Sequence, residues 1–467
     1  MDWSMEVNGG SSKEMPGFLT RVWQGIISIF AMVKSCFRGF FERVWKLGKD
    51  DPRRVVHSLK VGLALTLVSL FYFMRPLYDG VGGMAIWAVM TVVVVFEYSV
   101  GATLSKGLNR GFATLLAGSL AVGVHELASL SGDKSEPIIL GISVFLQATV
   151  FTFLRFFPTI KTRYDYGAMI FILTFSLVSV SGYRVDKLLE MAHQRLSTIL
   201  IGSALCVLVS MLVCPVWAGE DLHNLIAKNL DKLAASVEGV VAENFKEGEG
   251  EEEGEINEEN PSVLGYKCVL NSKPTEEALA NFARWEPAHG PFGFRHPWKQ
   301  YLKIGMAARY CAYSLEALNA CTNSDSQAAQ ELTQHLKAVC TKVGHVSSDL
   351  LLDLSSTVKK MTTSSHTDLL VAQLNIAVQE LQLALKILSN PLPVHVSIPD
   401  IVLIATVASL TVEISARVED VAEAVEELSR IAHFKTETAE ENKQKAATIK
   451  ALADSDGPHV AIHVDSL

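Results

Sequence analysis

The chain has 467 residues, of which 49% are hydrophobic and only 19% are charged. Residues 1–215 carry 20 Lys and Arg against 14 Asp and Glu, a net of +6, whereas residues 216–467 carry 21 against 36, a net of −15. Almost all long apolar runs lie in the first part. This distribution excludes a disordered chain, a disulfide-rich secreted domain and a basic nucleic-acid-binding protein. It predicts a membrane-embedded half followed by a water-soluble half.

Residues 1–50 form the N-terminal segment, whose first 16 residues are polar and lack the pattern of a signal peptide. The run Phe18–Val33 is apolar enough to suggest a membrane span, but Arg21 and Gln24 interrupt it. Between Arg21 and Lys49, lysines and arginines are interleaved with aromatic residues. This mixture favours an amphipathic helix lying on the anionic cytosolic leaflet over a seventh span.

Residues 51–218 contain six apolar runs, three of them on the short side for a bilayer core of about 30 Å. Short connections make them consecutive hairpins. The predicted spans are Val61–Leu77, Val81–Val100, Gly111–Leu130, Pro137–Phe157, Tyr166–Gly182 and Leu196–Ala218. Lys and Arg gather before the first span and in the second-to-third and fourth-to-fifth loops. The positive-inside rule therefore places these loops, and both chain termini, in the cytosol.

Residues 219–434 are predicted to form a cytosolic helical bundle with negligible strand content. The predicted helices are Asp221–Phe245, Thr275–Arg284, Trp298–Asn323, Ser326–Leu352, Thr367–Leu388 and Val402–His433. The apolar start of the last helix is too short to span a bilayer, so we expect a buried core helix. The Glu- and Gly-rich stretch 246–260 is expected to be a disordered loop, and residues 435–467 a disordered tail. The fold class is thus an all-α membrane protein of six spans followed by a helical bundle.

Long blocks of the chain read DPRRVVHSLKVGLAL (51–65), AIWAVMTVVVVFEYSVGATLSKGLNRG (85–111), FLRFFPTIKTRYDYGAMIFILTF (153–175), VCPVWAGEDLH (213–223) and ARWEPAHGPF (283–292). These blocks resemble the plant aluminium-activated malate transporter family, which are anion channels. The resemblance covers most of residues 50–390. It implies a homodimer with passive, voltage-dependent permeation of malate and inorganic anions. Some members of the family respond to extracellular aluminium, and others do not.

Three cations are candidates for lining an anion pathway. Lys106 and Arg110 are four residues apart, so they share one helix face near the cytosolic end of the third span. Arg195 lies at the extracellular end of the sixth span, where positive-inside anchoring does not explain it. An anion pathway needs positive groups at spaced depths, and the family resemblance also implies basic pore residues here. The alternative for Lys106 and Arg110 is anchoring to lipid phosphates. Gly107 and Gly111 permit a close helix contact beside them.

Two further residues, Glu97 and Arg155, are expected to support these cations. Glu97 falls within the predicted second span, where an isolated carboxylate would be costly, so we expect it to pair with Lys106, Arg110 or Arg155 and to orient them. Its alternative is an interfacial residue outside the lipid. Trp87 and Trp217, near the ends of spans, are expected to anchor at the interface or to pack.

Asp79, Asp186 and Glu190 are the acidic residues expected on the extracellular side, and the last two share one helical face just before Arg195. Hard trivalent cations prefer carboxylate oxygen. The resemblance to family members that sense aluminium makes these three residues the candidate Al³⁺ ligands. Arg184 and Lys187 lie close in sequence and offer the alternative of a solvated, self-neutralised loop.

The motif Trp285-Glu286-Pro287, followed by His289, lies in a Pro- and Gly-rich loop. No nucleophile or second acid accompanies it, and Pro287 restricts the backbone, so we expect a structural docking role. The seven cysteines are scattered and show no zinc-ligand spacing, and there is no cofactor-binding loop or triad. The sequence therefore predicts neither an enzyme nor a bound cofactor.

The predicted function is an anion channel for malate and smaller anions, in a plant plasma membrane in preference to the vacuolar membrane. The alternative is a secondary carrier or exporter of organic acids, which should show repeated halves with broken helices at matched positions. The sequence has no clear internal repeat. A membrane-bound scaffold is the second alternative, but it would not need Arg195 in the membrane.

Overall fold

A computed structural model describes residues 18–74, 85–132, 134–182, 188–244, 264–321, 327–388 and 398–436. Asp79, Asp186, the whole acidic stretch 246–260 and the tail from residue 437 lie outside these ranges, so the expectations for them stay predictions. Among the described residues the regular secondary structure is helical, apart from two strands of two residues each, β1 (Thr362–Thr363) and β2 (Lys435–Thr436), which pair in parallel. The protein is thus an all-α membrane protein, as predicted.

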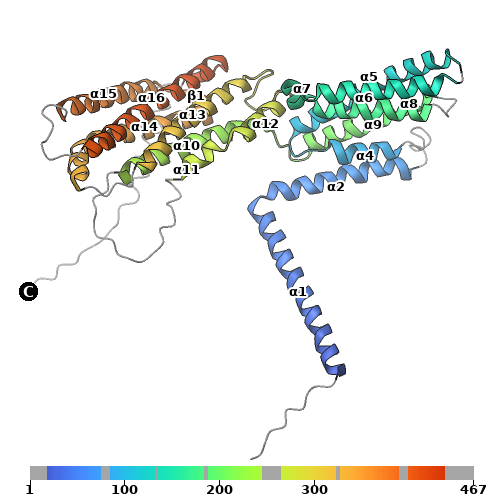
Figure 1. Ribbon diagram of the computed structural model, residues 1–467, viewed down its shortest axis with the longest axis horizontal. Helices are drawn as coiled ribbons and strands as arrows, with labels where there is room; N and C mark the ends of the chain where they lie inside the picture. The colour runs from blue at the N-terminus through green and yellow to red at the C-terminus, as the bar shows by residue number, and fades with distance from the viewer. Residues whose placement is uncertain are drawn as a thin grey trace, which may run out of the picture.

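The N-terminal half consists of long apolar helices that lie side by side (Figure 1). Proline is the first or second residue of three of these helices, where a missing N–H costs nothing. Large apolar side chains such as Phe112, Phe145 and Phe153 are more than 60% exposed on their outer faces. Such faces suit lipid rather than water. The helices are α2 (Pro52–Phe73), α4 (Ala85–Val95), α5 (Val100–Ser129), α6 (Glu136–Leu154), α7 (Pro158–Arg163), α8 (Asp165–Gly182) and α9 (Leu188–Leu212).

Among the described residues, four helical segments are long and apolar enough to cross a membrane: Val100–Ser129, Glu136–Leu154, Ala192–Leu212 and Ile401–Ile431. Two shorter apolar helices, Ile86–Val95 and Asp165–Ser181, correspond to predicted spans. The segment Ile401–Ile431 belongs to the C-terminal half, where Ile404, Ala408 and Ile414 join the buried core. Its length and composition alone would suit a span, but its packing is that of the core helix expected from the sequence.

The second predicted span differs from the structure. It was expected to continue from Val81 to Val100 with Glu97 inside it, but α4 ends at Val95 and α5 begins at Val100. The side chain of Ser99 caps α5 by accepting a hydrogen bond from the Ala102 N–H. Glu97 therefore lies in the link between two helices rather than within a span, because a local N-cap ends the apolar run that hydropathy alone would continue.

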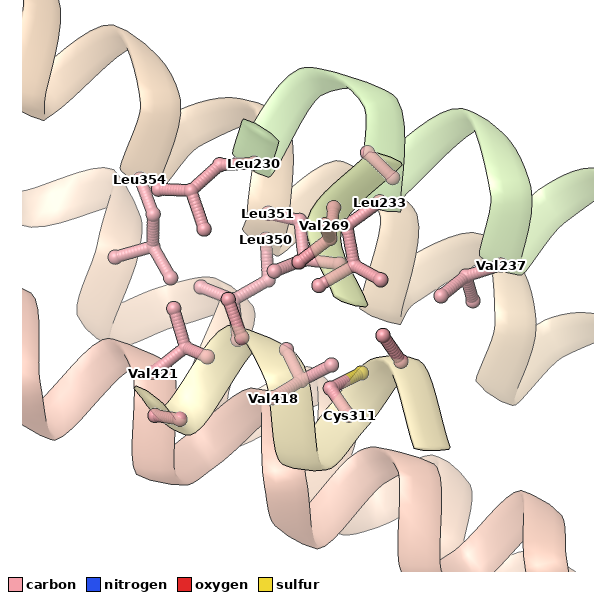
Figure 2. Close-up of a cluster of buried hydrophobic side chains, with 14 of the residues drawn as sticks. Leu230, Leu233, Val237, Val269, Cys311, Leu350, Leu351, Leu354, Val418 and Val421 are labelled. Carbon is pink, nitrogen blue, oxygen red and sulfur yellow. The ribbon is translucent and has the colours of Figure 1, made fainter. Parts of the chain in front are cut away.

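The C-terminal half is a helical bundle with one large apolar core, which we call the C-terminal bundle. In Figure 2, side chains from α10, α11, α13, α14 and α16 converge on this core, among them Leu230, Val269, Cys311, Leu350 and Val418. The core positions recur at helical spacing, which is why these segments were predictable. The helices are α10 (Ala218–Asn244), α11 (Gly265–Leu270), α12 (Lys273–Ala283), α13 (Trp298–Ala320), α14 (Gln327–Lys360), α15 (Ser365–Leu388) and α16 (Ile398–Ile431).

Helix α1 (Phe18–Asp50) stands apart from both halves and runs across the direction that α5, α6, α8 and α9 share (Figure 1). Only Asp51 separates it from α2. The Asp51 side chain accepts a hydrogen bond from the Arg53 N–H at 3.2 Å, which caps α2 and ends the preceding helix there.

Candidate functional site

Arg110 is buried in the N-terminal half with a single hydrogen-bonding partner. Its Nη1 donates to the hydroxyl of Tyr166 on α8 at 3.1 Å, while its Nε has no partner. Lys106, one turn earlier on α5, lies 5.6 Å from the centroid of the same Tyr166 ring and pairs with Glu97. One tyrosine therefore contacts both cations, through its hydroxyl and through its π face. No carboxylate in the described part of the chain pairs with Arg110.

Arg195 on α9 is also buried, with 8% of the residue exposed. Its guanidinium carbon lies 4.3 Å from the centroid of the Trp87 ring on α4, and its Nε has no hydrogen-bond partner. Within the described ranges it has no ion pair. Stacking on an indole stabilises a guanidinium without neutralising it. Trp87, expected as an interface anchor or packing residue, thus packs against a charge.

The three cations lie at different levels of one helix pair. A Cβ added at Gly107 would lie 3.5 Å from Ser203, and one at Gly111 would lie 3.5 Å from Leu200, so α5 and α9 run antiparallel in close contact. Arg195 precedes Leu200 by five residues, whereas Arg110 adjoins Gly111. At about 1.5 Å per residue, Arg195 is about 9 Å beyond Arg110, and Lys106 is about 6 Å behind it.

Other buried polar groups in these helices lack hydrogen-bond partners. They include the hydroxyls of Thr114, Ser179 and Ser203 and both polar atoms of the Gln147 side chain. An unpaired buried polar group costs about 1–3 kcal/mol, and several together are rare in a dry core. A polar pathway between the helices would give them partners.

Glu97 and Arg155, the two residues expected to support the cations, belong to two separate ion pairs. Glu97 pairs with Lys106, one of its three expected partners. Arg155 does not pair with Glu97. It binds Asp165 with two hydrogen bonds of 2.6 and 3.2 Å, closing the connection between α6 and α8 around α7. Proximity along the chain explains the difference, because Arg155 and Asp165 are ten residues apart across one short turn.

The structure does not describe the side chains of the three candidate aluminium ligands. Asp79 and Asp186 lie outside the described residues, and Glu190 lies in α9 without a described side chain. Within the described residues no group of three His, Cys, Asp or Glu is arranged to hold a metal ion.

Glu286 of the Trp-Glu-Pro motif lies at the junction of the two halves. Its Oε1 accepts hydrogen bonds from the Gly101 N–H at 3.2 Å and the Ala218 N–H at 2.7 Å, and its Oε2 accepts one from the Gly219 N–H at 3.0 Å. These amides belong to the first turns of α5 and α10. One carboxylate therefore caps two helices, at the positive ends of both dipoles. A side chain at Gly101 would overlap the Phe282 carbonyl oxygen, so glycine permits this approach.

Burial raises the pKa of Glu286 above its usual value, and the three amide hydrogen bonds and nearby His289 oppose that rise. His289 stacks on Trp217 with ring centroids 3.9 Å apart, and its Nδ1 lies 2.9 Å from the Pro287 carbonyl oxygen. The Trp-Glu-Pro motif is thus a packed joint between α5 and α10. The arrangement around it offers hydrogen bonding and charge balance, with no nucleophile placed for chemistry.

Further contacts tie the two halves together at the same end of the apolar helices. Arg53 Nη1 donates to Asp221 Oδ1 at 3.0 Å, and Asn281 Nδ2 donates to the Thr162 carbonyl at 2.9 Å. Within the N-terminal half, Lys60, 2% exposed, ties α2 to the end of α9 by donating to the Cys214 carbonyl at 2.7 Å. The starts of α2 and α5 and the α6–α8 connection, all predicted as cytosolic, therefore meet the C-terminal bundle at one end.

Sequence reasoning did not identify Tyr166 or Lys60 as part of these arrangements. Tyr166 is uncharged and begins an apolar run, so nothing in its local pattern marks it as a partner of two cations. Lys60 was counted only among the positive charges before the first span. Its burial depends on Cys214, which is 154 residues away.

The chain matches the family model described as aluminium activated malate transporter over residues 45–395. It is 46% identical over 474 residues to aluminum-activated malate transporter 10 of Arabidopsis thaliana, covering 94% of this chain and 95% of that protein. It is 50% identical over 392 residues to aluminum-activated malate transporter 2 of the same plant, with 84% and 77% covered. The wheat (Triticum aestivum) aluminum-activated malate transporter 1 is 44% identical, with 98% and 100% covered.

Proposed function

Because the chain belongs to the aluminium-activated malate transporter family, a family of transporters and not of enzymes, we propose that it is an anion channel. It conducts malate and inorganic anions passively and with voltage dependence. The names of the relatives support malate as a transported anion.

The observation that carries this proposal is the state of Arg110 and Arg195. Both are buried among apolar helices, neither has a carboxylate partner among the described residues, and they lie at different levels of the α5–α9 pair. A buried cation without a counter-ion is costly in a membrane unless it serves a passing anion. Tyr166 and Trp87 hold the two guanidiniums in place without neutralising them. Lys106, partly neutralised by Glu97, would attract anions more weakly at one end.

The proposed topology has six spans, formed by α2, α4, α5, α6, α8 and α9, with both termini and the C-terminal bundle in the cytosol. Support comes from the basic loops predicted as cytosolic, which are the loops that contact the bundle. Two chains would form the channel as a homodimer, as the family resemblance implies. We propose the plasma membrane as its location, in preference to the vacuolar membrane.

We further propose that extracellular Al³⁺ acts on Asp79, Asp186 and Glu190. Glu190 precedes Arg195 by five residues on α9, so a cation bound there would move the helix that carries a pore charge. In this arrangement sensor and gate share one helix. Equal currents with and without micromolar aluminium at acidic external pH would show a family member that does not depend on aluminium.

A secondary carrier of organic acids is the competing function. Carriers bind substrate at broken helices in matched repeats. In the described ranges α5 and α9 are continuous past Arg110 and Arg195, which favours a channel.

The proposed function is tested by recording from the purified chain in planar bilayers with malate on one side. A channel gives discrete current steps, whereas the current through a single carrier is too small to appear as steps. Arg110→Ala and Arg195→Ala should lower malate current strongly, and Arg195→Glu should lower it further, because like charge repels the anion. Arg295→Ala, at an exposed position of the C-terminal bundle, is the matched control. Unchanged conductance and selectivity in Arg195→Ala would remove that residue from the pathway.

A further inference from the structure

The second half of α1 exposes a row of large apolar side chains that nothing in the described chain covers. Trp45 is 80% exposed, Phe41 65%, Phe37 60% and Phe40 58%. Val33, Phe37, Phe40, Phe41 and Val44 follow helical spacing, so at 100° per residue they form one continuous face. A face of this size on a soluble element marks an interaction surface.

The charges on the same helix are mostly basic. Residues 32–50 contain five Lys and Arg against Glu42 and Asp50. Lys46 and Lys49 fall on the face away from the phenylalanines, and Lys34, Arg38 and Arg43 flank the apolar face. Long basic side chains at the border of an aromatic face can extend to phosphates while their stems cover apolar surface.

The direction of α1 fits the same partner. The helix joins α2 at Asp51 and turns across the shared direction of the apolar helices (Figure 1). A helix that runs across the direction of the spanning helices, at the end where the basic loops lie, is placed to lie along the membrane surface. The C-terminal end of α1 is tied to the protein there, because Asp51 binds Arg54 at 3.0 Å and Arg53 binds Asp221.

We propose that residues 32–50 of α1 dock onto the anionic cytosolic leaflet of the bilayer, with the Phe37–Phe40–Phe41 face among the acyl chains and the basic face toward lipid phosphates. The partner is the anionic lipid surface rather than a second copy of the chain, because the positive charge of α1 complements acidic headgroups. The proposal requires that α5–α9 cross the membrane but does not depend on anion conduction. Its failure therefore leaves the proposed function intact.

The experiment uses the full chain, spin-labelled at one position and reconstituted into vesicles. Cys36, Cys214, Cys268 and Cys321 are replaced by serine, while the buried Cys206, Cys311 and Cys340 are kept. Burial raises the pKa of Cys311 to about 12 and of Cys340 to about 11, so these two thiols react slowly with the label. A nitroxide is placed at Phe41→Cys on the apolar face or, as matched control, at Lys49→Cys on the basic face. Its collisions with oxygen and with a water-soluble nickel chelate are measured.

In vesicles containing phosphatidylserine, the label at position 41 should collide severalfold more with oxygen than with nickel, and the label at 49 should show the reverse. The contrast should be lost in phosphatidylcholine vesicles and in the variant K34Q/R38Q/R43Q/K46Q with the label at position 41. A variant with Lys and Arg exchanged at these four positions should retain it. A label at 41 shielded from both reagents would overturn the proposal in favour of a protein contact. A label at 41 open to nickel, or a contrast that neutral vesicles leave unchanged, would also overturn it.

Discussion

Arg110 and Tyr166 form the one side-chain hydrogen bond that joins a proposed pore cation to a neighbouring helix in the described structure, with Nη1 and Oη 3.1 Å apart. The same ring lies 5.6 Å from Lys106 Nζ. Tyr166 therefore contacts both cations, Arg110 through its hydroxyl and Lys106 through its ring. These two features of the side chain can be separated by substitution.

Tyr166→Phe should separate these two roles, since it removes the hydroxyl and keeps the ring. Loss of a hydrogen bond to a charged group costs about 1.5–3 kcal/mol, so Arg110 should lose its fixed orientation. We expect a lower malate conductance and a changed malate-to-chloride permeability ratio, measured from reversal potentials. Tyr164→Phe, at an exposed position in the same connection, is the control. An unchanged ratio in Tyr166→Phe would show that the hydroxyl does not orient Arg110.

Trp87→Leu should weaken anion binding at Arg195, because the guanidinium loses the indole on which it stacks at 4.3 Å. A desolvated cation–π contact of roughly 1–2 kcal/mol corresponds to about a five- to thirtyfold loss of apparent malate affinity. The measurement is current against malate concentration. Met90→Leu, exposed on the same helix, should have no effect. Equal affinity in Trp87→Leu and wild type would contradict a role for the stack.

Glu286→Gln should destabilise the junction between α5 and α10. The amide retains one acceptor oxygen but presents N–H groups to backbone donors and loses the charge that both helix termini favour. We expect a loss of about 1–3 kcal/mol in the free energy of unfolding, measured by thermal unfolding of the purified protein in detergent. Glu277→Gln, an exposed position on α12, is the matched control. Identical melting of both variants would show that the carboxylate is replaceable.

Acid should weaken the C-terminal bundle through two histidines, the buried His223 and the partly buried His296. They share the Tyr301 hydroxyl, which lies 3.0 Å from His223 Nδ1 and 3.2 Å from His296 Nε2. Burial lowers the pKa of His296 to about 4 and also lowers the pKa of His223. Well above pH 6.5 both histidines are neutral in the folded and in the unfolded chain, so they do not lower the free energy of unfolding there. As pH falls from 6.5 toward 4 the unfolded chain binds protons that the folded chain excludes, so stability falls.

The expected loss between pH 7.5 and 5.5 is roughly 1–2 kcal/mol, because the rings retain some solvent contact. It is measured as the change in unfolding free energy in detergent. His296→Gln should reduce this dependence on pH, whereas His366→Gln, on the bundle surface, should not. A wild-type protein whose stability rises over the same interval would refute the assignment.

Most helices of this protein were predictable from local sequence. Apolar periodicity marked α10, α12, α13 and α15 to within a few residues, because each buries one face in a common core. The candidate pore cations stood out in the sequence because charge is rare and costly in an apolar run, as at Arg195, and their place in a pore stays a prediction. The break between α4 and α5 was missed because the Ser99 cap is a local hydrogen bond inside a run that is hydrophobic apart from a few residues near its end, such as Glu97.

The sequence by itself determined that the chain is a membrane protein with a helical C-terminal half, since hydropathy and charge are properties of composition along the chain. It also determined which residues carry unusual charge. Only the tertiary structure decided their partners: Tyr166 for Arg110, Trp87 for Arg195, and the first turns of α5 and α10 for Glu286. These contacts join residues 56, 108, 185 and 68 positions apart. The physical reason is that pairing depends on how helices pack, and local periodicity contains no information on which neighbour a buried group meets.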